Sequence, residues 1–283
     1  MSGGDSPTMS ASLFAAVTAA RNKYSNIYVC FDAFRGLVED KPGDIVSLEK
    51  SVLSAFSSNL LIQSGYSVLH CPRYDFKPEE CVMKATQTIQ KYGEGSLENC
   101  DLLTIGGDGT MMGTLGLTEK GVHAASVCAS IDCDLNTACN CGSVDYMGGF
   151  ATAIDSNVSL LDALRRSGEA SNRYDIVQVM GRNSGYLSLM TALASGSLCV
   201  IPEKTKDWSE DDFEDYFTRT ILDMNGKGIK SFSFVVSEGI TPVRGGTIKG
   251  FNVDPKETYV YELAKKLTKK TELVVRANIA GYE

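Results

Sequence analysis

The sequence predicts an α/β fold built mainly from parallel sheet. Short apolar runs alternate along the chain with longer amphipathic stretches, which is the pattern of repeated strand–helix–strand units. Several apolar runs lead through a turn containing glycine or aspartate into the next amphipathic stretch. With 283 residues, 43% of them apolar, the chain can form one large domain or two domains with buried cores. We place a domain boundary near residue 143.

The alternation can be followed element by element. In the first part of the chain, the stretches expected to be helices are Ser10–Asn22, Leu48–Gln63, Pro78–Tyr92 and Thr110–Thr118. The runs expected to be strands are Asn26–Phe31, Ser67–Cys71, Asp101–Ile105 and His123–Cys128. In the second part, Ser209 and the acidic residues after it are typical of a helix start. The helices expected there are Phe150–Ser167, Tyr186–Ala194, Ser209–Asn225 and Pro255–Leu267, and the strands are Tyr174–Val179, Leu198–Ile201, Ser231–Val236 and Glu272–Ala277.

Composition and charge narrow the function classes. The net charge of −8 is a poor match for a nucleic-acid backbone, which binds to basic surfaces. The sequence has no apolar run of about 18 residues and no basic-then-apolar start, so we expect neither a membrane-spanning helix nor a signal peptide. The cysteines are scattered, and Cys133, Cys139 and Cys141 match no zinc-ligand spacing. We therefore expect a cytoplasmic protein with reduced thiols.

The loop Gly106–Thr110 reads Gly-Gly-Asp-Gly-Thr between an apolar run and a helix-like stretch. Open parallel sheets bind ligands beyond the carboxyl ends of their strands, so such loops are informative. Glycines let the backbone approach oxyanions closely, and the N–H groups of a helix start point at negative charge. The Asp108 carboxylate would repel a bare phosphate, so it indicates a divalent cation between the two. This loop predicts a metal–nucleotide site.

Ser130–Asp134 follows the next expected strand and places two carboxylates two positions apart. In an extended segment Asp132 and Asp134 point the same way. One could take a proton from a hydroxyl, because two close negative charges raise one pKa. The alternative is a surface turn stabilised by the aspartates.

Three arginines and one glutamate are further candidates for ligand-binding residues. Arg173 and Arg182 bracket an expected strand, and the planar guanidinium of arginine matches phosphate oxygens. Arg182 follows Gly181 in a strand-to-helix turn, where it could meet a transferring phosphoryl group. Arg73 stands in another basic loop, and the Glu203 carboxylate could accept hydrogen bonds from sugar hydroxyls. The alternative for both bracketing arginines is a solvated surface position.

Taken together, these segments resemble the phosphofructokinase family. The segments that carry the resemblance are Ser2–Met9, Phe31–Leu37, Gly106–Thr110, Ser130–Asp134, Val179–Arg182 and Ile201–Glu203. They are similar to the family's Ser-Gly-Gly-Asp-Ala-Pro-Gly-Met loop, its Gly-Leu segment, Gly-Gly-Asp-Gly-Ser, Thr/Ser-Ile-Asp-Asn-Asp, Val-Met-Gly-Arg and Pro-Glu. Their order and approximate spacing agree over nearly the whole chain.

The resemblance implies two Rossmann-like parallel-sheet domains with the site in the cleft between them. Residues 1–142 would form the nucleotide-binding domain and residues 143–283 the sugar-phosphate-binding domain. The implied activity is that of a glycolytic kinase, which transfers the γ-phosphoryl group of ATP to the 1-hydroxyl of fructose 6-phosphate with Mg²⁺. Family members assemble with shared sites, so a homo-oligomer is implied, with no nucleic-acid or membrane partner.

The resemblance also assigns roles. Asp132 would be the general base, Arg182 would stabilise the transferring phosphoryl group, and Asp108 would hold Mg²⁺. The residues that would bind the nucleotide and its phosphates are Gly4, Arg73, Gly106, Gly107, Gly109, Thr110 and Gly113, with Arg73 at the γ-phosphate. The residues that would hold the sugar are Ser130, Asp134, Met180, Gly181 and Glu203. Arg173 would reach the sugar phosphate of a neighbouring subunit.

The phosphoryl donor and the departures from the family pattern leave alternatives open. Pyrophosphate-using relatives typically carry Asp at the position of Gly109 and Lys at that of Ala129, so this chain favours ATP. Cys133 replaces an Asn, the segment after Asp134 is several residues longer, and the family's first strand and Gln-Arg-Gly-Gly-type segment are missing. We therefore expect a chain truncated at both ends.

Three other functions stay open on the sequence. A pyrophosphate-dependent enzyme is one, and a kinase acting on NAD or a diacylglycerol lipid is another. The latter shares the glycine loop but has no role for Val-Met-Gly-Arg. The third is a non-catalytic phosphofructokinase-like subunit or fragment. The retained Asp108, Asp132 and Arg182 argue against it, and the missing C-terminal segment argues for it.

Overall fold

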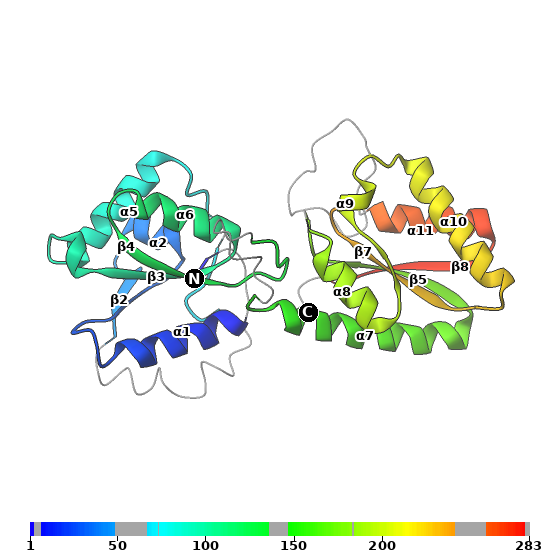
Figure 1. The fold of residues 1–283 in the computed structure, drawn as a ribbon, viewed down its shortest axis with the longest axis horizontal. Helices are drawn as coiled ribbons and strands as arrows, with labels where there is room; N and C mark the ends of the chain where they lie inside the picture. The colour runs from blue at the N-terminus through cyan, green and yellow to red at the C-terminus, as the bar shows by residue number, and fades with distance from the viewer. Residues whose placement is uncertain are drawn as a thin grey trace, which may run out of the picture. The chain divides into compact units, whose positions relative to one another are not determined.

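A computed structural model describes residues 1–2, 7–48, 67–72, 74–135, 147–182, 184–240 and 259–280 (Figure 1). The chain divides into two compact units. The first unit comprises Met1–Ser130 and Leu135–Gly149, and the second comprises Ile131–Asp134 and Phe150–Glu283. Helices alternate with strands in both units, and most neighbouring strands run parallel. The predicted α/β class is therefore confirmed. None of the helices among the described residues is long and apolar enough to cross a membrane.

The first unit contains a parallel strand pair and an antiparallel one. Its elements are α1 (Pro7–Ala20), β1 (Tyr28–Cys30), α2 (Phe34–Glu39), β2 (Ile45–Ser47), α5 (Glu79–Tyr92), the 3-10 helix η1 (Leu97–Asn99), β3 (Asp101–Gly106), α6 (Asp108–Thr118) and β4 (His123–Cys128). β3 and β4 run parallel in register from Asp101 opposite His123 to Gly106 opposite Cys128. β1 and β2 pair antiparallel.

Helices cover β3 on two sides. The apolar positions of α1 recur every four residues, so Met9, Leu13 and Val17 share one face and pack on Ile105 of β3. On the other side, α5 and α6 bury Ile89 and Leu117 in a second cluster. Figure 1 shows α1 on one side of β3, with α5 and α6 on the other. The carboxyl end of β3 is thereby held firmly in place.

One predicted strand is wrong and one predicted helix lies outside the described residues. Ser67–Cys71 forms a turn, because the His70 N–H donates to the Ser67 carbonyl and His70 has a φ of 59°. Its backbone groups bond elsewhere: the Val68 N–H donates to Ser10 Oγ, and the Leu69 carbonyl accepts from Asp32. Leu48–Gln63 falls almost wholly outside the described residues.

The second unit is a four-stranded parallel sheet with helices on both faces. Its elements are α7 (Phe150–Ser171), β5 (Arg173–Val179), α8 (Tyr186–Ser195), β6 (Leu198–Val200), α9 (Pro202–Thr205), α10 (Glu210–Gly226), β7 (Phe232–Ser237), α11 (Tyr259–Thr271) and β8 (Val274–Ile279). The strand order is β6-β7-β5-β8, and every neighbouring pair is parallel. All seven residues of β5 are buried, as expected for a central strand covered on both faces.

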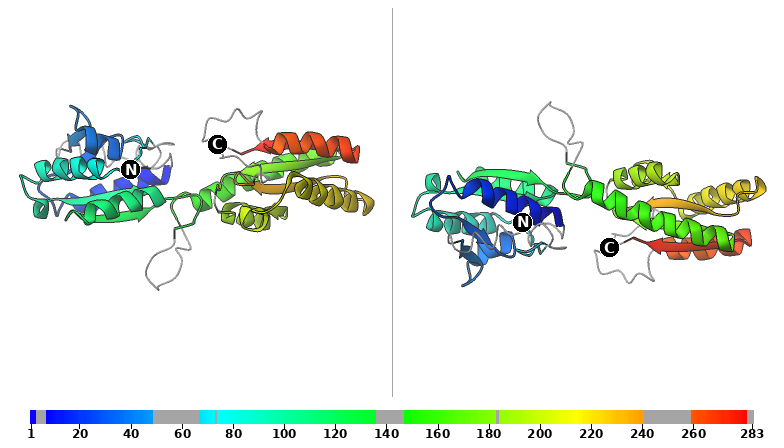
Figure 2. Two further views of the ribbon diagram at one scale, coloured as in Figure 1. Left: turned by 90° about the horizontal axis from the view of Figure 1, so that it is seen from above. Right: turned by 90° about the horizontal axis from the view of Figure 1, so that it is seen from below.

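Two apolar clusters lie on the two faces of this sheet. On one face, α10 and α11 contribute Phe213, Phe217 and Leu263 to a cluster around Phe234 of β7. On the other, α7 and α8 pack on Val177 of β5. Figure 1 shows α10 and α11 on one side of the strands and α7 and α8 on the other, and Figure 2 shows the same elements from above and from below. The start of α10 was predicted correctly, because Ser209 and Asp212 form a reciprocal capping box there.

Candidate active site

The loop Gly106–Thr110, called the phosphate loop because it is predicted to bind phosphate, lies where β3 ends and α6 begins. β3 ends at Gly106, Gly107 is the residue before the helix, and α6 begins at Asp108. No side chain caps this helix start. Backbone N–H groups of the first turn, other than that of Thr110, which donates to the Gly107 carbonyl, are therefore the donors available there to an anionic ligand. Thr110 Oγ1 donates to the Ser2 carbonyl at 3.1 Å, and the Ser2 N–H donates to the Ile105 carbonyl at 3.0 Å. These bonds fix Ser2, the first residue of the segment Ser2–Met9, alongside the phosphate loop.

Asp108 is suited to a cation. It is exposed at the first position of α6, and no ion pair to its carboxylate is found within the described residues. Its oxygens are the hard donors that Mg²⁺ prefers, and phosphate oxygens could complete a coordination sphere. The residues present therefore fit the cation that the sequence implies.

The glycines of this loop have different surroundings. A Cβ on Gly106 would overlap Thr110 Oγ1 and the Ser2 carbonyl, whereas a Cβ on Gly109 would meet nothing within 4 Å. Gly113, one turn further into α6, lies against Phe34, and a Cβ there would be 2.8 Å from that ring. Its proposed contact with nucleotide stays a prediction. Gly4 and Arg73 lie outside the described residues.

The contrast between Gly106 and Gly109 gives a matched test. We expect Gly106→Ala to destabilise the chain by about 1–3 kcal/mol, as overpacking typically does. Gly109→Ala should be neutral or slightly stabilising, because Ala favours helices and the space is open. Urea unfolding of both variants checks this. Equal midpoints for the two would contradict the crowding at Gly106.

Asp132 is fixed by a residue from a distant part of the sequence. Ile131–Asp134 belong to the second unit, and Ser184 Oγ donates to the Asp132 carbonyl at 3.0 Å. The backbone bends at Ile131 and Asp132, and Cys133 has a φ of 49°. The segment is therefore not extended, and the condition under which both carboxylates would point the same way is not met. The role that the resemblance implies for Asp132 does not depend on that condition.

The loop after β5 is held by the loop after β7. Gly181 has a φ of 118°, a conformation that glycine adopts without strain. The Glu238 N–H donates to the Val179 carbonyl at 2.9 Å, and the Gly239 N–H to the Gly181 carbonyl at 3.3 Å. Arg182 is exposed beside them. The carboxyl ends of β5 and β7 thus place Met180, Gly181, Arg182 and Glu238 together.

The Glu203 carboxylate has an internal partner. The Gly185 N–H donates to Glu203 Oε1 at 2.7 Å, just before α8 begins. A carboxylate at a helix N-terminus is favourable because it meets the positive end of the helix dipole. Glu203, which lies two residues after the predicted strand Leu198–Ile201, therefore positions the start of α8. Its contact with a sugar stays a prediction.

Arg173 lies at the opposite end of β5 from Gly181. Seven residues of parallel strand span about 20 Å, so the two ends are well separated. Arg173 Nε lies 3.0 Å from Asp175 Oδ2, and both side chains are almost fully buried. Burial raises the pKa of Asp175, although Arg173 and the Asn278 amide act in the opposite direction. A single copy of the chain therefore does not bring Arg173 to Arg182.

Comparison with known proteins identifies the family. The sequence model described as phosphofructokinase matches residues 1–283. The chain belongs to the phosphofructokinase family. Its curated relatives include an ATP-dependent 6-phosphofructokinase of Clostridium perfringens, 31% identical over 99% of this chain and 76% of that protein. Another is the ATP-dependent 6-phosphofructokinase of Vibrio campbellii, 32% identical over 99% of this chain and 75% of that protein.

Solved phosphofructokinase structures share the fold. The T-state enzyme of Pichia pastoris aligns with a TM-score of 0.75 at 23% identity, covering 99% of this chain and 29% of that one. A pyrophosphate-dependent phosphofructokinase from Marinobacter aquaeolei aligns with a TM-score of 0.71 at 18% identity, covering 99% and 67%. The Rossmann-like α/β fold predicted from the sequence is confirmed by these likenesses.

The structure adds one candidate residue that sequence reasoning missed. Glu238 follows β7, and its N–H donates to the Val179 carbonyl, next to Met180. No motif drew attention to Glu238, but a search for charged residues just after the predicted strands would have found it.

Proposed function

We propose that this chain catalyses transfer of the γ-phosphoryl group of ATP to the 1-hydroxyl of fructose 6-phosphate, the reaction of 6-phosphofructokinase. The observation that carries the proposal is the position of Asp132. Its backbone is bonded to Ser184, in the loop that also contains Gly181 and Arg182. A candidate base is thus tied to the loop that carries the candidate phosphoryl-stabilising arginine.

The phosphate side is formed by the loop at the start of α6. The exposed N–H groups there and the backbone of Gly106, Gly107 and Gly109 would bind phosphate oxygens. Thr110 supports the loop through its bond to Ser2. Asp108 would hold Mg²⁺, which when bound supplies charge neutralisation for the phosphates.

All but one of the proposed sugar-side residues belong to the second unit, and the exception is Ser130. Asp132 would accept the proton of the 1-hydroxyl, and Arg182 would stabilise charge on the transferring group. Ser130, Asp134, Met180, Gly181 and Glu203 are proposed to hold the sugar, and Glu238 joins them because it lies beside Gly181. Most of the rate enhancement would come from positioning and electrostatic stabilisation, as in phosphoryl transfer generally.

ATP is the proposed donor. The curated relatives of this chain are named as ATP-dependent, and Gly109 has open space around its Cα. An aspartate there would occupy that space and repel the α-phosphate of a nucleotide. The open surroundings mean that it would do so without disturbing α6, where an acidic residue in the first turn is favourable.

We therefore expect Gly109→Asp to lower activity with ATP by about tenfold or more, the factor that corresponds to roughly 1.4 kcal/mol of repulsion. The measurement is fructose 6-phosphate phosphorylation with ATP and with pyrophosphate as alternative donors. Gly109→Ala is the control and should keep most of the ATP activity. Wild-type activity with pyrophosphate alone would overturn the choice of donor, and inactivity with both donors would overturn the kinase proposal.

We also propose that the functional form is a homo-oligomer with shared sites. The position of Arg173, about 20 Å along β5 from Gly181, supports this, because a role for Arg173 at a sugar phosphate would require the site of another copy. An inactive Asp132→Ala chain and an inactive Arg173→Lys chain should then regain activity when mixed and reassembled. Recovery near a quarter to a half of wild type is expected. No recovery, with hybrids present by native mass spectrometry, would contradict shared sites.

A further inference from the structure

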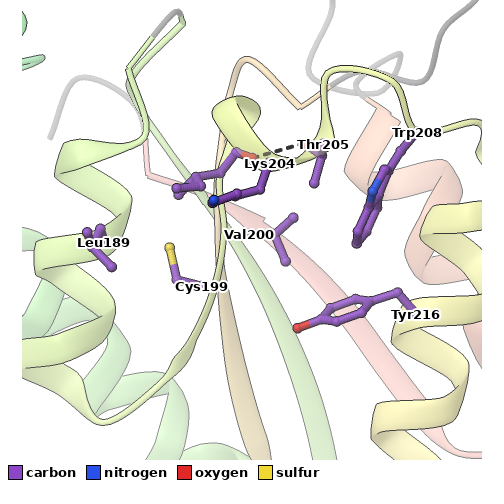
Figure 3. Close-up of a pocket in the computed structure, with 8 residues that line it drawn as sticks. Leu189, Cys199, Val200, Lys204, Thr205, Trp208 and Tyr216 are labelled. Atoms are coloured by element: carbon purple, nitrogen blue, oxygen red, sulfur yellow. Dashed lines mark hydrogen bonds between the residues drawn. The ribbon is translucent and has the colours of Figure 1, made fainter.

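A pocket of about 270 Å³ lies along the outer edge of β6 in the second unit (Figure 3). Among the described strands, β6 pairs only with β7, so its other edge is open. Leu189 of α8 lies on one side of the pocket in Figure 3, and Trp208 and Tyr216 lie on the other. Cys199 and Val200 of β6 lie between them. Ile201, Lys204 and Thr205 complete the lining.

The lining combines apolar walls with one cation. Figure 3 shows the Lys204 amino group extending toward the space above β6. No acidic partner of Lys204 is found within the described part of the chain. Burial raises the pKa of Tyr216, so its hydroxyl remains a neutral donor, and burial raises the pKa of Cys199 to about 11. The nearby Glu203 carboxylate is engaged by the Gly185 N–H.

We propose that this pocket binds a small molecule with one carboxylate and an apolar ring or chain. The carboxylate would pair with the Lys204 ammonium group and accept a hydrogen bond from the Tyr216 hydroxyl. The apolar part would contact Leu189, Val200 and the Trp208 ring, which offers a large flat surface. A concave, mostly apolar pocket with few polar groups is the usual form of a small-molecule site.

The same pocket is connected to the start of α8. Ile201 lines the pocket and also packs on Gly185, where an added Cβ would lie 2.5 Å from Ile201 Cγ2. The Leu189 N–H donates to the Gly185 carbonyl at 2.8 Å. A ligand that presses on Ile201 and Leu189 therefore changes the surroundings of Gly185, which follows Ser184. Any effect on phosphoryl transfer rests on the proposed function, but binding does not.

The chain offers a specific probe of this pocket. It contains one tryptophan, Trp208, so tryptophan fluorescence and the single indole N–H resonance report on the pocket alone. Benzoate is the test ligand, and benzyl alcohol is its uncharged counterpart. We expect a saturable change in both signals with benzoate in the millimolar range, and weaker binding of benzyl alcohol. The Gly185 amide resonance should shift and saturate at the same benzoate concentration.

Two lysine variants form a matched pair. Lys204→Met should weaken benzoate binding by about tenfold or more, since it removes the charge that pairs with the carboxylate. Lys206→Met, two residues away and outside the lining, should bind benzoate as the wild type does. Far-UV circular dichroism checks that both variants fold.

Three results would overturn the proposal: no saturation with benzoate, equal affinity for benzyl alcohol, or equal binding by the two variants. A Gly185 resonance that stays fixed while the Trp208 signals saturate would overturn the connection to α8. None of these measurements needs catalysis. An inactive but benzoate-binding chain would therefore count against the proposed function only.

Discussion

Replacing Asp132 by Asn is expected to lower kcat by about 10²–10⁴-fold, the usual contribution of a positioned general base. The change keeps the size of the side chain and removes its ability to accept the sugar hydroxyl proton. The backbone is expected to stay in place, because Ser184 donates to the Asp132 carbonyl and not to its side chain. The measurement is steady-state phosphorylation of fructose 6-phosphate by ATP, with the KM for both substrates.

Asp211→Asn is the control, since Asp211 is an exposed residue in the first turn of α10. It should leave kcat unchanged. If Asp132→Asn retained most of its kcat, or raised only the KM for the sugar, Asp132 would be a binding residue and another group would have to accept the proton.

Replacing Asp175 by Ala is expected to cost about 3–5 kcal/mol of unfolding free energy, because it leaves the buried Arg173 charge without its partner. Asp175 also accepts a hydrogen bond from the Asn278 amide at 3.1 Å, so a second buried group loses its bond. Urea unfolding followed by circular dichroism gives the change in midpoint and in slope.

Two comparisons show whether the cost comes from burial. Asp162→Ala breaks an ion pair with Arg165 whose side chains are 43% and 57% exposed, and it should cost at most about 1 kcal/mol. The double variant Arg173→Met/Asp175→Leu should recover much of the loss, because no charge then remains buried. If the double variant lost as much unfolding free energy as Asp175→Ala, the loss would be explained by packing and not by the buried charge.

Local sequence patterns were sufficient for most of the fold. The alternation of short apolar runs and longer helix-like stretches located β4, α6 and β5 to within two residues. The pattern did not predict the shortest helices. α2 has six residues and α9 has four, which is too little sequence for a helical period to show.

The predictions failed where distant residues determine the local structure. Ser67–Cys71 is apolar enough to be a strand, but the bond from the Val68 N–H to Ser10 and the bond from the Asp32 N–H to Leu69 hold it as a turn. The Glu203 carboxylate was considered only as a ligand for sugar, since nothing in the sequence shows that Gly185, 18 positions earlier, donates to it. The bond from Ser184 to Asp132 joins residues 52 positions apart and is equally invisible. The site is therefore less predictable than the elements that carry it.

The allocation of Ile131–Asp134 to the second unit determines how the proposed roles are divided between the units. The chain leaves the first unit after Ser130, contributes these four residues to the second unit, returns for Leu135–Gly149 and leaves again. Asp132 therefore belongs to the same unit as Ser184 and Arg182, while Asp108 belongs to the other unit. The proposed proton acceptor and the proposed phosphoryl-stabilising arginine can thus be held by the packing of one unit alone, and the proposed nucleotide-binding loop by the packing of the other.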